Sequence, residues 1–139
     1  MIKTKIMLKR AIDFHGHLGP YLVLGLLMGD LAINKLKCKR HFGIKAIVKG
    51  AEHKPKSCLI DGIQVSTGCT YGKGNIVKLS GSSINTEFIN LGNNKKIKIC
   101  LKKDLVKKLD SLIGHRASEG FAGELLKTNP AELFEFMTG

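Results

Sequence analysis

The chain has 139 residues, of which 43% are hydrophobic and 24% charged. This length and balance predict one folded domain over residues 1–139 and exclude a disordered chain. The formal net charge of +12 favours solubility or an acidic protein partner. Nucleic-acid binding is disfavoured, because Trp is absent and nearly all the basic residues are Lys rather than Arg.

No stretch of the sequence predicts export or membrane insertion. The basic start, residues 1–5, is not followed by a long apolar region. The most apolar run, residues 21–28, is too short to cross a bilayer, and Asp30 follows it closely. We therefore expect a cytoplasmic protein without a membrane partner. Four Cys in such a chain favour free thiols or metal ligands over structural disulfides.

The first half of the chain predicts helices and one strand. The helices are expected at residues 6–12, 21–37 and 57–65, and the strand at residues 44–49. Pro20 suits the start of the second helix, which is apolar almost all round and therefore buried. Gly25 and Gly29 share one face of it and allow another backbone to approach, either within the core or across a dimer interface. Ser57 is the expected N-cap of the third helix.

The second half predicts strands followed by helices. Strands are expected at residues 76–80, 86–91 and 95–101, and helices at residues 105–113, 117–127 and from 129 onward. The last helix has a strong start signal, with Asn129 as cap and Pro130 as first helical residue. The order predicts an α+β class: a single domain with a central, mainly antiparallel sheet, packed against a long buried N-terminal helix and C-terminal helices.

Two imidazoles precede the buried helix. His15 and His17 flank Gly16, whose backbone freedom lets both rings turn toward one centre. The free N–H groups at a helix start also suit an anionic ligand. The plain alternative is a helix cap with two ordinary, partly exposed His side chains.

A second cluster begins with a thiol at the start of the third helix. Cys58 lies in its first turn, a position expected to lower the thiol pKa. Cys69 follows the helix and could converge on Cys58 if the loop folds back. Asp61 shares a face with Cys58 and could orient a ligand. Lys73 lies between two Gly, but the Walker spacing of a phosphate loop is absent.

Each residue of this cluster also has a plain alternative. Cys58 could be a small buried residue, Asp61 a surface carboxylate and Lys73 a solvated side chain on a turn. The other Cys and His side chains lack partners at a recognised spacing, and we expect no function for them: Cys38, Cys100, His41, His53 and His115.

Together these segments resemble the E-subunit family of formylmethanofuran dehydrogenase. The resemblance rests on residues 14–17, 57–64 and 67–75, which follow the family's order and spacing along residues 10–80. It implies an α+β core domain, often dimeric, with a metal site as its active centre. The metal ligands implied are His15, His17, Cys58 and Cys69.

The chain departs from the family pattern at particular positions. Many members have a Cys where this chain has Gly19, a Gly where it has Tyr21 and an Arg where it has Leu27. The chain therefore lacks a thiol and a positive charge that could pair with an anion. Any reaction that needs either group is in doubt for this chain. The zinc finger that some members carry at the C-terminus is not expected, because no Cys follows Cys100.

The leading interpretation is a metal-binding homodimer with the ligands His15, His17, Cys58 and Cys69. The metal expected is a divalent ion, zinc in the first place, with Ni²⁺, Co²⁺ and Fe²⁺ as alternatives. Its candidate catalytic residues are Cys58, Asp61 and Lys73. It would be accessory to a molybdenum or tungsten formylmethanofuran dehydrogenase of methanogenesis-type metabolism, within a dehydrogenase complex, or an enzyme in its own right. The alternatives are a metal-free thiol enzyme, with Cys58 as nucleophile and a His base, and a basic interaction module.

Overall fold

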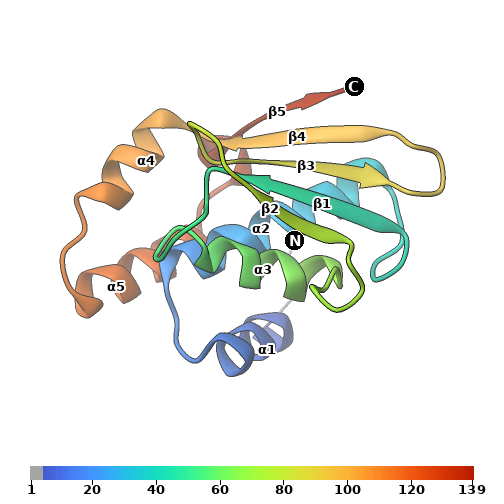
Figure 1. Cartoon of the computed structure of the whole chain (residues 1–139). Coiled ribbons are helices and arrows are strands. Elements are labelled where there is room, and N and C mark those ends of the chain that lie inside the picture. Colours follow the sequence, from blue (N-terminus) through green and yellow to red (C-terminus); the bar gives the residue numbers. More distant parts are fainter. Residues whose placement is uncertain (1–4) are drawn as a thin grey trace.

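Five strands form one sheet in the order β2-β1-β3-β4-β5 in the computed structural model, which describes residues 5–139 (Figure 1). The strands are β1 (Ile44–Lys49), β2 (Ile76–Leu79), β3 (Asn85–Asn90), β4 (Lys96–Leu101) and β5 (Phe134–Thr138). Neighbouring strands are antiparallel except for the parallel pair β1 and β2. The predicted mainly antiparallel sheet is confirmed. Residues 1–4, with most of the basic start, lie outside the described residues.

Most of the helices lie on one side of this sheet (Figure 1). They are α1 (Lys5–His15), α2 (Pro20–Leu36), α3 (Cys58–Thr67), α4 (Lys103–Asp110), α5 (His115–Leu126) and α6 (Pro130–Leu133). The long helix α2 packs against α3, α5 and α1, and it also reaches strands β3 and β4. The predicted buried helix and α+β class are both confirmed. No helix within residues 5–139 is long and apolar enough to cross a membrane.

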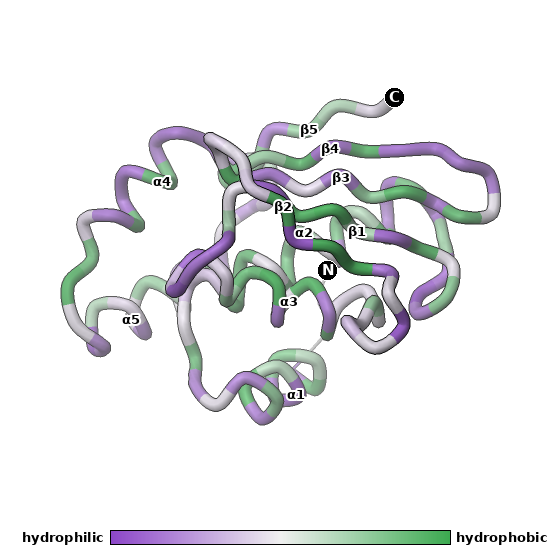
Figure 2. The backbone as a smooth tube through the Cα atoms, in the orientation of Figure 1, coloured by the Kyte–Doolittle hydropathy of each residue, from purple (hydrophilic) through white to green (hydrophobic). Residues whose placement is uncertain are grey.

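The core lies between the sheet and helices α2 and α3. Alternate residues of β1 are buried, so Ile44, Ala46 and Val48 face the helices. Phe88 of β3 is paired with Ala46 and is also fully buried. Figure 2 shows hydrophobic stretches of α3 and of the neighbouring strands on the two sides of this core. This packing fixes the two helices that carry the candidate site.

Glycines let α2 and α3 touch backbone to backbone. A Cβ at Gly25 would overlap the carbonyl oxygen of Leu59, and a Cβ at Gly62 would overlap that of Leu22. Gly29 lies in the same way against the Ser66 side chain. The close approach expected at Gly25 and Gly29 is therefore an internal contact of the core.

The C-terminal segment differs from the expected helix. Asn129 does cap a helix, by accepting a hydrogen bond from the Ala131 amide, but α6 ends at Leu133. Residues 134–138 then pair with β4 as an edge strand, with Phe134 opposite Leu101. Sheet pairing with a strand about 35 residues earlier overrides the local helix signal.

Candidate functional site

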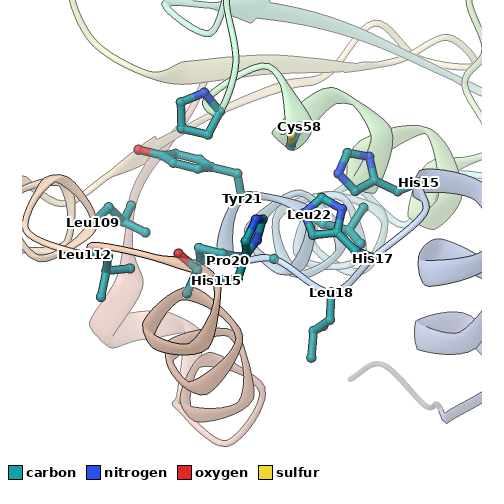
Figure 3. Close-up of a pocket in the computed structure, with 13 residues that line it drawn as sticks. His15, His17, Leu18, Pro20, Tyr21, Leu22, Cys58, Leu109, Leu112 and His115 are labelled. Carbon is teal, nitrogen blue, oxygen red and sulfur yellow. The ribbon is translucent and has the colours of Figure 1, made fainter.

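A cavity of about 230 Å³ lies where the α1–α2 loop meets the first turn of α3 and the first turn of α5 (Figure 3). One part of its wall carries imidazole and thiol groups, from His15, His17, Cys58 and His115. The rest is mostly apolar and is formed by these residues: Leu18, Gly19, Pro20, Tyr21, Leu22, Pro55, Leu109, Leu112 and Ser118. The cavity brings together three of the four predicted metal ligands.

His15 is held by a carboxylate from a different helix. Its Nδ1 lies 2.6 Å from Oδ2 of Asp61, in the first turn of α3. The Gln64 side chain donates a second hydrogen bond, of 3.4 Å, to Asp61 Oδ1. An ionised carboxylate accepts the proton of Nδ1, and this leaves the lone pair of Nε2 free. Asp61 thus fixes the orientation of the His15 ring.

The other nitrogen of His15 is buried without a partner. The His15 side chain is 10% exposed. Its Nε2 atom makes no hydrogen bond to any described residue. A buried polar atom without a partner costs free energy. Because His15 also lines the cavity, its unpartnered nitrogen is a candidate ligand-binding atom.

Two further imidazoles continue from His15 toward the surface. Gly16 has a φ of +108°, which favours glycine and turns the chain between the two His residues. The ring centroids of His15 and His17 are 4.9 Å apart. The ring of His115 stands edge-on to His17, with a centroid distance of 6.5 Å. Both His17 and His115 are exposed.

Cys58 is the first residue of α3 and lines the same cavity (Figure 3). The thiol pKa was expected to be lowered by the helix start, and this is wrong. Burial raises the pKa of Cys58, the negative charge of Asp61 raises it further, and Lys54 opposes them only in part. The free thiol is therefore protonated at neutral pH. Ser57 precedes the helix as expected, but its side chain makes no capping hydrogen bond.

The structure does not bring Cys69 or Lys73 to this cavity. Both follow the C-terminal end of α3, and this ten-residue helix is about 15 Å long. Cys69 is fully buried, and its thiol lies 3.5 Å from the carbonyl oxygen of Ile44. Lys73 donates a 2.7 Å hydrogen bond to the Gly68 carbonyl oxygen and so satisfies the helix end. Cys58 and Cys69 therefore lie at opposite ends of α3.

His115 lines the cavity, although no sequence pattern predicted it there. It begins α5 after Gly114, and no Cys or carboxylate lies near it at a recognised spacing. α5 packs against α2, and His115 lies beside His17 in the loop that precedes α2. Its position after a glycine at a helix start is the one local signal that could have been used.

These side chains do not yet form a closed metal site. Within residues 5–139, no group of three or more His, Cys, Asp or Glu side chains is arranged so that it could hold a metal ion. The side chains of His15, His17, Cys58 and His115 nevertheless line one cavity. Metal binding there would need side-chain rotation, which the exposed ring of His17 allows.

Comparison with known proteins identifies the family of the chain. The family model described as "FmdE, Molybdenum formylmethanofuran dehydrogenase operon" matches residues 14–135. The chain is 37% identical over 83 residues to a probable S-adenosyl-L-methionine-binding protein of Archaeoglobus fulgidus. That match covers 55% of this chain and 21% of the relative, so the chain spans about a fifth of the relative's length.

A solved structure shares the fold. It is a tungsten formylmethanofuran dehydrogenase E-subunit (FmdE)-like protein from Syntrophus aciditrophicus, with a TM-score of 0.70 and 21% sequence identity. The match covers 95% of this chain and 69% of the other chain. At this identity the likeness establishes the fold.

Proposed function

The chain belongs to the FmdE family, and we propose that it is a metal-binding protein whose cavity holds a divalent transition-metal ion, zinc in the first place. The ligands proposed are His15, His17 and Cys58. Asp61 is proposed to position His15. Imidazole and thiolate together suit zinc better than the hard ions Mg²⁺ or Ca²⁺.

The observation that carries this proposal is the pair His15 and Asp61. A metal-binding His usually donates its second ring N–H to a carboxylate, which fixes the tautomer and raises the basicity of the ligating nitrogen. Here the Nδ1 of His15 is 2.6 Å from Asp61. Its Nε2 is buried and has no partner among the described residues. A metal ion would satisfy that lone pair.

The spacing of the His15 and His17 rings also fits two imidazoles bound to one metal ion. With metal–nitrogen bonds of about 2.0–2.1 Å, two imidazoles on one tetrahedral ion have their centroids about 5 Å apart. The centroids of His15 and His17 are 4.9 Å apart. Rotation of the exposed His17 ring and of the Cys58 thiol would complete the contact.

A metal-free thiol enzyme is less well supported. Such an enzyme needs a thiolate, but burial and Asp61 raise the pKa of Cys58. A metal ion removes this obstacle, because its charge displaces the thiol proton on binding. Cys69 cannot act as a resolving thiol for Cys58 from the other end of α3.

We further propose that the protein is accessory to a molybdenum or tungsten formylmethanofuran dehydrogenase. The description of the matching family model, which names the operon of that enzyme, supports this role. The family resemblance also supports a homodimer, and light scattering against the 15.2 kDa mass of one chain tests it.

Metal titration of untagged, chelator-treated protein tests the metal site. We expect wild type to bind one Zn²⁺ or Co²⁺ per chain. His15→Ala should lose far more than the roughly 10–100-fold that a change outside the ligand set costs. His41→Asn is the matched control, since His41 lies near Gly68 at the far end of α3 and its φ of +71° tolerates Asn. Equal affinity of wild type and His15→Ala would refute the proposal.

A further inference from the structure

We infer that His115, at the start of α5, is a further ligand of this metal site and supplies its third imidazole. The inference rests on the proposed metal binding and extends it to a residue from the C-terminal part of the chain. It predicts a four-coordinate site with three nitrogens and one sulfur, contributed by three separate segments.

The need for a fourth donor comes from the ion. Zinc is almost always four-coordinate, and His15, His17 and Cys58 supply three donors. A site with three protein ligands keeps its fourth position for water or substrate, whereas a fourth protein ligand closes it. Which of these holds depends on whether another donor reaches the cavity.

The other polar side chains near the cavity are poor candidates. The two oxygens of Asp61 already interact with His15 and Gln64. Tyr21 lines the cavity, but a phenol must lose its proton to bind a metal, and burial opposes this. Ser118 offers only a neutral hydroxyl. The imidazole of His115 is the remaining donor of a type that zinc prefers.

The geometry places His115 within reach. Its ring centroid is 6.5 Å from that of His17. Two imidazoles on one ion need about 5 Å, so these two rings must approach by about 1.5 Å. Side chains must also rotate to bring His15 and Cys58 to the same ion, since the described residues form no ready-made metal group. His115 is exposed and is the first residue of its helix, so its ring can rotate without displacing core residues. Both rings line the same cavity of about 230 Å³, which leaves room for the ion.

A bond from His115 would also join two parts of the fold. His115 belongs to α5, which packs against α2, whereas His15 and His17 belong to α1 and the following loop. A shared ion would hold the start of α5 against that loop. Metal binding should therefore slow amide hydrogen exchange in the first turns of α5.

Cobalt titration of matched variants tests the inference. Co²⁺ is added to chelator-treated wild type, His115→Ala and His41→Asn, and the affinity is read from the visible absorption of the bound ion. We expect His115→Ala to bind at least tenfold more weakly than wild type, with a changed spectrum, and His41→Asn to match wild type. Free imidazole should restore part of the wild-type spectrum in His115→Ala, because it can fill the vacated position.

The results separate the two claims. If wild type and His115→Ala bind Co²⁺ with equal affinity and identical spectra, His115 is not a ligand, and the three-ligand site stands. If wild type binds no Co²⁺, the proposed metal site is refuted together with this inference. Hydrogen exchange in α5 gives an independent readout, and an unchanged rate on metal addition would also overturn the role of His115.

Discussion

The Nδ1 atom of His15 lies 2.6 Å from the Oδ2 atom of Asp61, and this contact joins the last residue of α1 to the first turn of α3. The two residues are 46 positions apart in the chain. Because α3 carries both Asp61 and Cys58, one helix positions the ring of His15 and presents the thiol beside it.

Asp61→Asn should weaken metal binding by about 10–100-fold without abolishing it. The amide keeps the size of the side chain but loses the charge that holds the Nδ1 proton of His15. Competition with a coloured chelator gives the affinity. Asp13→Asn, on an exposed position of α1, is the matched control. An affinity of Asp61→Asn equal to that of Asp13→Asn would remove Asp61 from the site.

Metal affinity should rise with pH because binding expels the Cys58 proton. The pKa of this thiol is raised, chiefly by burial, so neutral pH lies below this pKa and the free thiol keeps its proton. In that range, affinity should increase by up to about tenfold per pH unit for one thiol. Titrations between about pH 7.5 and 9, above the ordinary range of His, should show this slope.

The control for this slope is Cys58→Ser, which has no thiol proton to lose. It should bind more weakly, and its affinity should depend less on pH over the same interval. An identical pH slope in wild type and Cys58→Ser would show that Cys58 is not a ligand.

Gly19→Cys should tighten metal binding. Gly19 has an extended backbone, with a φ of −143°, which any residue adopts. A Cβ there would lie 3.5 Å from the Nε2 of His17, an ordinary contact. Many FmdE members resemble this variant at that position. We expect at least tenfold tighter Zn²⁺ binding than in Gly19→Ala, which adds the Cβ alone; equal affinities would count against a metal site here.

Gly25→Ala should destabilise the fold. Its Cβ would overlap the Leu59 carbonyl oxygen, and the Gly62 backbone opposite leaves no side chain to move aside. Overpacking of this kind costs about 1–3 kcal/mol or more of the free energy of unfolding. Urea denaturation measures it. Gly123→Ala on α5 is the control: its Cβ would meet no atom within 4 Å, so it should stabilise by up to about 1 kcal/mol.

The free energy of unfolding should fall at alkaline pH because the buried Tyr21 phenol opposes ionisation. Burial, with a smaller effect of Asp110, raises its pKa from 10.0 to about 12. The folded state thus favours the neutral phenol. The contribution of this phenol to the free energy of unfolding is complete below pH 10 and is lost as the pH rises toward 12. The loss should be about 2 kcal/mol over that range. Tyr21→Phe should remove this pH dependence, whereas Tyr71→Phe, at an 88% exposed position, should leave it unchanged.

Local sequence patterns were enough to predict most of the fold. The helix that ends at Leu36 is apolar almost all round, which predicts its burial. The alternation of Ile44, Ala46 and Val48 with polar residues predicts a strand with one buried face. The strand of Phe134 could not be predicted in this way, because its state depends on pairing with Leu101. A good helix start at Asn129 says where a helix begins but not that it ends after four residues.

Local spacing in the sequence was enough to pair those residues in or beside the cavity that are close together in the chain. His15 and His17 flank one glycine, and Cys58 and Asp61 share one turn of α3, so each pair could be found in the sequence. His115 could not, since α5 reaches the cavity only through tertiary packing. The thiol pKa was predicted with the wrong sign because the desolvation of Cys58 depends on neighbours outside its own helix.

The cavity takes its polar wall from the beginning, the middle and the last third of the chain, at His15, Cys58 and His115. Without α5 folded in place, the cavity would be open to solvent on the side that His115 lines. An ion held by all three segments would therefore recognise the completed fold. At a free metal concentration a hundred times Kd, that linkage adds about 2.7 kcal/mol to stability. Metal supply would then set how long the protein resists proteolysis.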